Sequence, residues 1–219
     1  MFISTQDLEK IYKDDSVLIL DARSYKDYSN SHIPGAVSLD LFSFHWADTS
    51  QKGLVSFGEH MRKILSYAGI DENKKIIFYD NTSGMLAARG VWMCLYFSHP
   101  DVHLLDGGLS KWTRENLPLV SESTIYKPSN LTTPLDPLVI IGFEELNANI
   151  GKITIIDARS PDEFDGTTPR AARGGHIPTA VNIDWNNNLD DSGKLKSDKE
   201  LESLYQIDKD TPIVTYCQG

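Results

Sequence analysis

The chain has 219 residues, of which 40% are hydrophobic and 24% are charged, as in an ordinary folded protein with room for one large domain or two small ones. Its formal net charge of −10 at pH 7 argues against a nucleic-acid partner, which would require a basic surface. The N-terminal residues lack the pattern of a secretory signal, and no apolar run approaches the ~18 residues that a membrane span needs. We therefore expect a cytoplasmic protein without a membrane partner, in which Cys94 and Cys217 are free thiols.

The first half of the chain predicts alternating strands and helices. Ser4 or Thr5 can cap a first helix, because the side-chain oxygen of either residue can accept a backbone N–H. Runs of apolar residues predict strands at 16–20, 37–39, 75–79 and 102–105. Helical periodicity predicts helices at 59–67, 85–97 and 109–116. The segment 42–58 has no clean period and is interpreted as loop and short helix. This alternation is typical of an α/β domain with a mainly parallel sheet flanked by helices.

A change of composition separates this half from the rest of the chain. Residues 118–137 contain four prolines among Ser, Thr and Asn, which favours an inter-domain linker. We predict a first domain at 1–120, a linker at 121–137 and a second domain at 138–219. Within the second domain, helices are expected at 143–150 and 201–205, and strands at 153–156 and 213–216. The last strand is expected to be buried, because its four residues are all β-branched or aromatic.

The second domain repeats the first. The Asp-Ala-Arg-Ser of residues 21–24 returns unchanged at 157–160, and the His-Ile-Pro of residues 32–34 returns at 176–178. The offset between the copies is 136 residues for the first motif and 144 for the second, a drift that small loop insertions explain. A shared order of strands, turn and helix at one long offset indicates two copies of one α/β domain.

Motifs that occur in both copies are expected to be structural. The aspartate and arginine of each Asp-Ala-Arg segment can form an ion pair or hydrogen-bonded brace at a strand end. The histidines, His32 and His176, each precede Ile-Pro and are expected to brace a turn. Cys94 lies in an apolar helix and is expected to pack in the core.

The copies differ at one chemically decisive position. Asp80 follows the strand at 75–79, whereas Cys217 follows its counterpart at 213–216. A cysteine thiolate can attack and carry a second sulfur atom, which an aspartate cannot do. A loop that leads from a strand into a helix N-terminus presents backbone N–H groups, which favour a thiolate and can hold a sulfur-centred anion. Cys217 is therefore predicted to be a catalytic nucleophile and the first copy to be its non-catalytic partner.

These motifs together resemble the tandem-domain rhodanese family, whose members are thiosulfate and 3-mercaptopyruvate sulfurtransferases. The resemblance covers essentially the whole chain and rests on the duplicated segments, on Leu-Leu-Asp-Gly-Gly-Leu-Ser-Lys-Trp at 104–112 and on Tyr216-Cys217. It implies two rhodanese-like α/β domains, the second incomplete, and transfer of a sulfane sulfur from a small anionic donor through a Cys217 persulfide to a thiol or cyanide. It implies no metal and no organic cofactor, because the protein thiol is the carrier. It leaves the oligomeric state unknown.

The resemblance also implies where the donor binds. Donor-binding arginines of the family often lie shortly after the Asp-x-Arg of the second domain, but the first such position here is Glu163. The loop that follows still offers two arginines. The substrate-binding candidates are therefore Arg159, Arg170, Arg173, Gln218 and Gly219.

The comparison of the copies predicts a truncated second domain. The first copy continues past Asp80 through a helix, a strand and another helix, which have no counterpart after Cys217. We expect such a form to be poorly stable and impaired in activity. Two alternatives stay open, namely a non-catalytic rhodanese-like binding or regulatory module and a phosphatase of the Cys-loop-Arg type. An assay of sulfane transfer from thiosulfate and from 3-mercaptopyruvate separates these readings.

Overall fold

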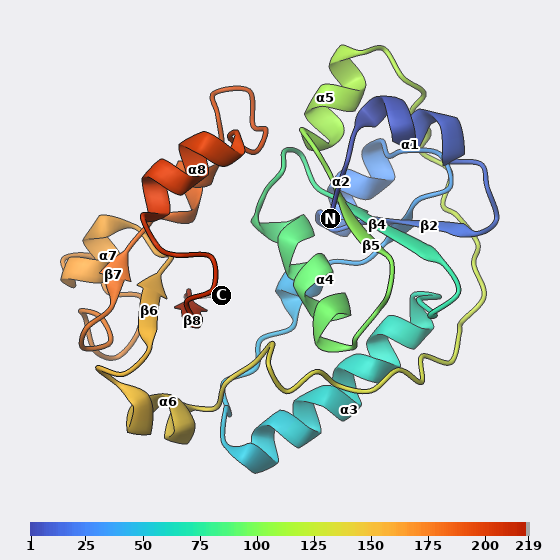
Figure 1. Cartoon of the computed structure of the whole chain (residues 1–219). Coiled ribbons are helices and arrows are strands. Elements are labelled where there is room, and N and C mark those ends of the chain that lie inside the picture. Colours follow the sequence, from blue (N-terminus) through green and yellow to red (C-terminus); the bar gives the residue numbers. More distant parts are fainter. Residues whose placement is uncertain (218–219) are drawn as a thin grey trace. The chain divides into compact units, whose positions relative to one another are not determined.

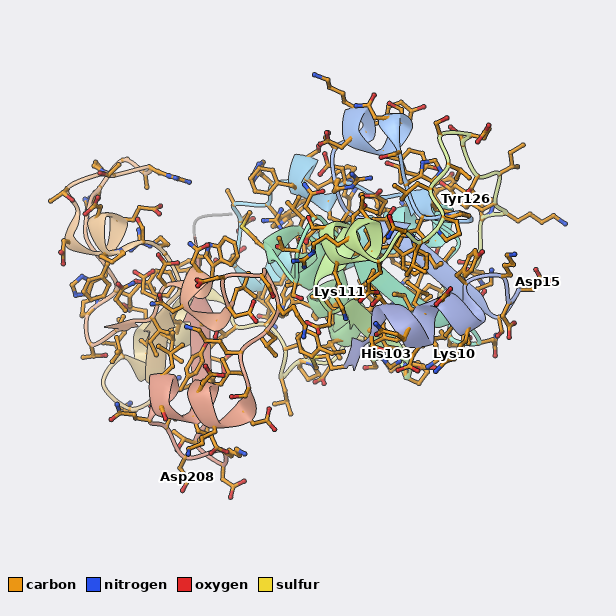
Figure 2. All side chains as sticks on the ribbon, turned by 90° about the horizontal axis from the view of Figure 1, so that it is seen from above. Lys10, Asp15, His103, Lys111, Tyr126 and Asp208 are labelled. Carbon is orange, nitrogen blue, oxygen red and sulfur yellow. The ribbon has the colours of Figure 1, made fainter. Side chains whose placement is uncertain are left out.

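The computed structural model describes residues 1–217 and divides into two compact units (Figure 1). Unit 1 comprises residues 1–140 together with 192–194, and unit 2 comprises residues 141–191 and the chain from Leu195 onward. Each unit is built on a parallel sheet flanked by helices, as the sequence predicts. The predicted boundaries at 120, 121, 137 and 138 stay a prediction. Lys10 and Asp15 in unit 1 and Asp208 in unit 2 are among the exposed charged side chains (Figure 2).

The sheet of unit 1 has five parallel strands in the order β1-β5-β4-β2-β3. In that order the strands are Phe2–Ile3, Val102–Leu105, Lys75–Tyr79, Val17–Asp21 and Val37–Ser38. β4 lies at the centre, and its side chains alternate between two separate hydrophobic clusters. Ile76 and Phe78 belong to one cluster, whereas Ile77 and Tyr79 belong to the other. The sheet is therefore buried on both faces, which explains its continuous apolar strands.

Helices cover this sheet at the positions that the sequence predicts, with two differences: an additional helix forms at 25–30, and the helix predicted at 59–67 begins earlier. The helices of unit 1 are α1 Thr5–Ile11, α2 Tyr25–Asn30, α3 Gln51–Tyr67, α4 Met85–Tyr96 and α5 Gly108–Arg114, with a 3₁₀ turn, η1, at Leu41–Ser43. The polar segment after Ser24 forms α2, because the Ser24 hydroxyl caps it by accepting the Asp27 N–H at 3.2 Å. Ser4 caps α1 in the same way, accepting from the Asp7 N–H at 3.1 Å.

The second difference is the start of α3, which lies eight residues earlier than predicted. Ser50 caps the helix, and its hydroxyl accepts the Gly53 N–H at 3.2 Å. The first half of the helix contains two glycines, which lower helix propensity and hide the apolar period. Gly53 is required by packing, because a Cβ atom there would lie 2.2 Å from the backbone carbonyl oxygen of Asp48. The interpretation of 42–58 as loop and short helix is therefore wrong for its second part.

The proline-rich segment is packed against unit 1. Residues 117–142 form no helix, and their only strand-like pairing is an isolated bridge between Val120 and His32. Leu131 is nevertheless buried in the core, where its carbonyl accepts an N–H of Arg62 at 3.0 Å. Arg62 also donates to the Thr133 carbonyl at 2.8 Å. The predicted linker is thus held to α3 through two of its carbonyl groups.

Unit 2 repeats the centre of this architecture on a smaller scale. Its three parallel strands have the order β7-β6-β8 and comprise Val181–Asn182, Thr154–Asp157 and Ile213–Tyr216. Its helices are α6 Phe143–Asn149, α7 Pro161–Asp165 and α8 Asp198–Tyr205, with a 3₁₀ turn, η2, at Trp185–Asn188. Among the described residues, no helix of either unit is long and apolar enough to cross a membrane.

The prediction that the strand at 213–216 is buried is wrong. β8 alternates between exposed and half-buried side chains, and Ile213 is 49% exposed. Within the described chain, β8 pairs with β6 and lies at an edge of its sheet, whereas its counterpart β4 is enclosed by β2 and β5. A run of β-branched residues indicates that a strand forms, but its burial depends on the elements that cover it.

Candidate active site

An aspartate, an arginine and a tyrosine form the same network at a strand end in both units. In unit 1, Arg23 donates to both carboxylate oxygens of Asp21, at 2.9 Å from Nε and 2.6 Å from Nη2. The hydroxyl of Tyr79 donates to Asp21 Oδ2 at 2.5 Å and accepts the Ile33 N–H at 3.2 Å. Asp21 and Tyr79 are partners in the register of β2 and β4. The network therefore joins two strands and the His-Ile-Pro turn.

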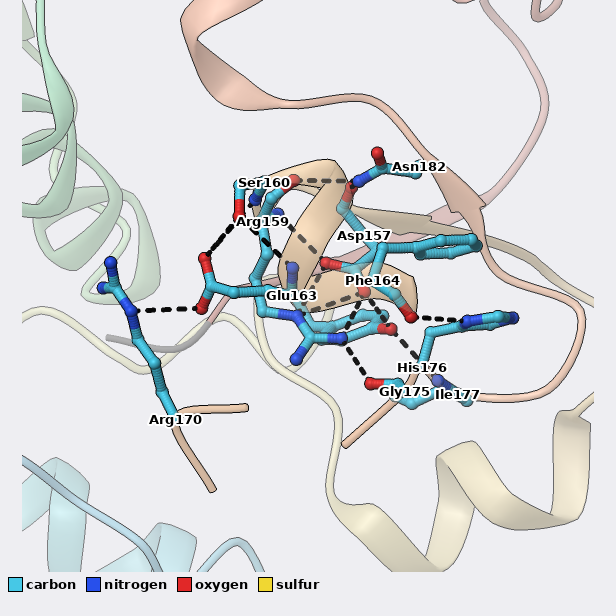
Figure 3. Close-up of polar contacts among 11 residues, drawn as sticks. Asp157, Arg159, Ser160, Glu163, Phe164, Arg170, Gly175, His176, Ile177 and Asn182 are labelled. Atoms are coloured by element: carbon cyan, nitrogen blue, oxygen red, sulfur yellow. Dashed lines mark hydrogen bonds and ion pairs between the residues drawn. The ribbon is translucent and has the colours of Figure 1, made fainter. Parts of the chain in front are cut away.

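Unit 2 reproduces this network almost atom for atom. Arg159 donates to Asp157 at 2.9 Å from Nε and 2.6 Å from Nη2, and it also donates to the Gly175 carbonyl at 2.9 Å (Figure 3). The Tyr216 hydroxyl donates to Asp157 Oδ2 at 2.5 Å and accepts the Ile177 N–H at 3.0 Å. Burial would raise the pKa of Asp157, but the hydrogen bonds from Arg159 and Tyr216 outweigh it and hold that pKa below its usual value.

These contacts confirm the predicted braces. Both Asp-x-Arg pairs are ion pairs with the aspartate fully buried. Nδ1 of His32 lies 2.8 Å from the Tyr28 carbonyl, and Nδ1 of His176 lies 2.9 Å from the Phe164 carbonyl. Each imidazole thus links its turn to the preceding helix. Binding of the donor by Arg159 stays a prediction, and the contacts above occupy its guanidinium in the brace.

Asp80 lies at the end of β4 and is held by the loop that follows it. Asp80 is 4% exposed, and its carboxylate accepts three backbone N–H groups, those of Thr82 at 2.9 Å, Gly84 at 3.2 Å and Ala87 at 3.1 Å. Gly84 precedes α4 and has no side chain to cap that helix, so Asp80 performs the capping from within the loop. The strand–loop–helix segment of unit 1 is therefore a set of N–H donors arranged around one anion.

The backbone of the Asp-Gly-Gly motif at 106–108 packs against this loop. Gly107 and Gly108 both have positive φ, at 79° and 55°, which favours glycine. A Cβ atom on Gly108 would lie 2.3 Å from the Thr82 carbonyl oxygen, so this backbone packs directly on the loop. The next residue, Leu109, donates its N–H to the Asp80 carbonyl at 2.8 Å. The motif is thus explained by close backbone packing around Asp80.

Cys217 occupies the corresponding place in unit 2, directly after β8. β8 pairs with β6 as β4 pairs with β2, so Cys217 follows Tyr216 just as Asp80 follows Tyr79. Its thiol is free and exposed, whereas Cys94 is free and buried in the core of unit 1, as predicted. Gln218 and Gly219, the two substrate-binding candidates after the cysteine, lie outside the described residues. The described part of the chain contains no group of three or more His, Cys, Asp or Glu side chains placed to hold a metal ion.

The two remaining arginines lie in a loop that is longer in unit 2 than in unit 1. Asp157 and His176 are 19 positions apart, whereas Asp21 and His32 are 11 apart, so the extra residues fall between these motifs. The loop closes on itself, because a Cβ atom on Gly166 would lie 2.7 Å from the Gly175 nitrogen. A loop whose ends meet in this way presents the residues between them at its tip.

Arg170 and Arg173 are the charged residues between those glycines. Arg170 Nε lies 3.5 Å from Oε1 of Glu163, and Figure 3 shows the arginine extended toward that carboxylate. Glu163 is almost buried and forms a capping box with Ser160 at the start of α7. Arg170 itself is 69% exposed in its side chain. The buried carboxylate of Glu163 therefore forms an ion pair with the exposed side chain of Arg170.

Comparison with known proteins agrees with this duplicated fold. The family model for the rhodanese-like domain matches residues 4–115 and 143–219. The chain belongs to the rhodanese family. Both units are rhodanese-like domains, and the family assignment made from the sequence is confirmed.

The rhodanese relatives include proteins of known name and structure. The chain is 30% identical over 236 residues to the sulfur carrier protein TtuD of Thermus thermophilus, with 100% of this chain and 82% of that protein covered. It is 32% identical over 207 residues to human 3-mercaptopyruvate sulfurtransferase, covering 90% of this chain and 69% of the human protein. The crystal structure of SseA, a 3-mercaptopyruvate sulfotransferase from Escherichia coli, superposes with a TM-score of 0.81 at 26% identity, covering 98% of this chain and 87% of SseA.

The sequence did not reveal one feature of this rhodanese site, the hydrogen bond between Tyr216 and Asp157. Tyrosine precedes the decisive residue in both copies, and this repetition was the available signal. The contact joins residues 59 positions apart, so it depends on the strand register, which a single sequence does not fix.

Proposed function

We propose that this chain is a sulfurtransferase that moves a sulfane sulfur from thiosulfate or 3-mercaptopyruvate to a thiol or cyanide through a persulfide on Cys217. One observation carries the proposal. Cys217 stands at the strand end where, in unit 1, the backbone N–H groups of the following loop surround the anionic side chain of Asp80. In a domain of the same fold, this position favours a thiolate and then a persulfide anion. The relatives named above support the same chemistry.

The reaction needs only the thiol and its surroundings. The Cys217 thiolate attacks the outer sulfur of thiosulfate, a new S–S bond forms, and the old S–S bond breaks with its electron pair leaving on sulfite. With 3-mercaptopyruvate the C–S bond breaks instead, and its electron pair passes to carbon as the enolate, which takes up a proton to give pyruvate. An acceptor thiolate or cyanide then attacks the outer sulfur of the persulfide and releases the Cys217 thiolate.

The arginine loop supports an anionic donor. The whole chain carries a net charge of −10, so a dianion such as thiosulfate requires local positive charge to approach it. The loop between Gly166 and Gly175 supplies Arg170 and Arg173 and contains no acidic residue. It lengthens the copy that carries the cysteine and is absent from the copy that carries Asp80. We assign donor binding to these two arginines.

The proposal is tested by locating the sulfur. The chain is reduced, incubated with thiosulfate or with 3-mercaptopyruvate, and digested without reductant, and the peptides are weighed. We expect the mass of one added sulfur atom on the peptide that contains Cys217, and its loss when cyanide is added. Sulfur on the Cys94 peptide contradicts the assignment of Cys217 as the carrier. No added sulfur with either donor contradicts the proposal and favours the non-catalytic binding module.

Removing the loop arginines is expected to weaken donor binding. Arg170→Ala and Arg173→Ala should each raise the KM for thiosulfate by about tenfold, because a hydrogen bond between charged groups contributes roughly 1.5–3 kcal/mol. The value of kcat should change less, since these residues do not touch the breaking bond. Steady-state kinetics of each variant with thiosulfate checks this expectation.

Lys209→Ala is the control for charge alone. Lys209 is exposed on the same unit and pairs with Glu202, so its removal changes the net charge by the same amount outside the loop. Its KM is expected to stay within about twofold of the unmodified chain, as for a screened surface charge. Equal KM values for Lys209→Ala and the loop variants would exclude a specific role of the loop.

A further inference from the structure

The residue directly before Cys217 is fixed by three parts of unit 2. The Tyr216 hydroxyl donates to Asp157 on β6 at 2.5 Å and accepts the N–H of Ile177 in the His-Ile-Pro turn at 3.0 Å. Asp157 is itself held by Arg159, which also binds the Gly175 carbonyl (Figure 3). One phenolic oxygen therefore links β8, β6 and the turn.

Within the described part of unit 2, few other contacts hold the end of β8. β8 lies at a sheet edge within the described chain and pairs with β6 alone, and Ile213 at its start is half exposed. In unit 1 the same tyrosine, Tyr79, is fully buried in the central strand between β2 and β5. Asp80 is further held by three backbone N–H groups of its loop. The end of β4 in unit 1 is thus held by two neighbouring strands and by the loop that follows it. The end of β8 in unit 2 depends more on the tyrosine hydroxyl.

Holding Tyr216 also determines the direction of the next side chain. Cys217 directly follows β8, which ends at Tyr216, so the rotation of the backbone at Tyr216 affects the Cα–Cβ direction of the next residue. Nucleophilic attack is sensitive to this direction, because a misplacement of about 1 Å can lower a rate by roughly 100-fold. We infer that Tyr216, held by Asp157 and the Ile177 N–H, is a positioning residue that aims the Cys217 thiol. The inference rests on the proposed function of Cys217.

The network has the chemistry that this role requires. Asp157 is ionised at neutral pH and accepts from both Arg159 and Tyr216, so the phenol acts as a donor to a charged group, which gives a strong hydrogen bond. The Arg159 guanidinium also lies over the Tyr216 ring, 5.3 Å from its centroid. Both the ring and the hydroxyl of Tyr216 are therefore held.

The test compares Tyr216→Phe with Tyr79→Phe, which removes the same hydroxyl from the matching network of unit 1. Two quantities are measured on folded protein: hydrogen exchange of the peptide that contains residues 213–217, and kcat and KM for loading sulfur from thiosulfate. For Tyr216→Phe we expect exchange about tenfold faster and kcat about tenfold lower with a nearly unchanged KM, as for the loss of one hydrogen bond to a charged group. For Tyr79→Phe we expect both quantities to match the unmodified chain.

The outcomes are distinguishable. Unchanged exchange and kcat in Tyr216→Phe, or an equal fall of kcat in both variants, overturns the positioning role. A fall that appears in KM instead of kcat also overturns it, because it assigns Tyr216 to donor binding. If the unmodified chain loads no sulfur, the proposed function fails, and the exchange measurement alone then decides whether Tyr216 holds the end of β8.

Discussion

Replacement of Cys217 by serine is expected to abolish sulfur loading from both thiosulfate and 3-mercaptopyruvate. A serine hydroxyl is scarcely ionised near neutral pH and cannot carry a sulfane sulfur, so the first step of the proposed reaction has no nucleophile. The Cys217 side chain is exposed, and serine has nearly the same shape. The free energy of unfolding is therefore expected to change by less than about 0.5 kcal/mol, as for most surface substitutions. Peptide masses after donor treatment and thermal unfolding of the same sample check both statements.

Cys94→Ser is the matched control, and it should behave in the opposite way. Cys94 is 1% exposed, and burial raises the pKa of its thiol, so it offers little thiolate to a donor. A hydroxyl placed there without a partner is expected to cost about 1–3 kcal/mol of stability. Sulfur loading at Cys217 should persist in this variant below its unfolding temperature. A Cys217→Ser variant that still loads sulfur at the unmodified rate would exclude Cys217 as the carrier.

The strands and the duplication could be read from the sequence because their signals are local. The strands at 75–79 and 102–105 were predicted with the bounds that β4 and β5 have in the structure, since buried parallel strands are unbroken apolar runs. The Asp-Ala-Arg pairing was predictable because the two side chains lie two positions apart at a strand end. Its repetition in a copy without the cysteine indicated a brace, which the hydrogen bonds of Arg23 and Arg159 confirm.

Features that depend on contacts between distant parts of the chain could not be predicted from local sequence patterns. The early start of α3 was missed because Gly53 and Gly58 resemble breaks in a helix until their close packing is known. The exposure of β8 was missed because its apolar residues predict a strand without specifying what covers it. The three N–H groups around Asp80 come from a loop and a helix start, and their convergence on one carboxylate is a property of backbone geometry.

Replacement of Asp80 by alanine is expected to destabilise unit 1 strongly. Alanine would leave the N–H groups of Thr82, Gly84 and Ala87 without their acceptor in a buried place, and it would remove the cap of α4. Burial raises the pKa of the Asp80 carboxyl, while these hydrogen bonds act against that rise, so relief of the burial cost offsets part of the loss. We expect the free energy of unfolding to fall by about 2–4 kcal/mol, the range for a lost cap combined with unpaired buried donors.

Two further variants distinguish the loss of the hydrogen bonds from the three N–H groups around Asp80, here called the anion cradle, from the loss of a negative charge alone. Asp80→Asn keeps one oxygen that can accept from Thr82 and Gly84, but its NH₂ group faces the Ala87 N–H, so an intermediate loss of stability is expected. Asp15→Ala removes an exposed carboxylate and should change the free energy of unfolding by less than about 0.5 kcal/mol. Tryptophan fluorescence mainly follows the unfolding of unit 1, because three of the four tryptophans lie there and only Trp185 lies in unit 2. If Asp80→Ala proved as stable as Asp15→Ala, the N–H groups at this strand end would not constitute an anion cradle, and the strongest physical support for a thiolate at Cys217 would be lost.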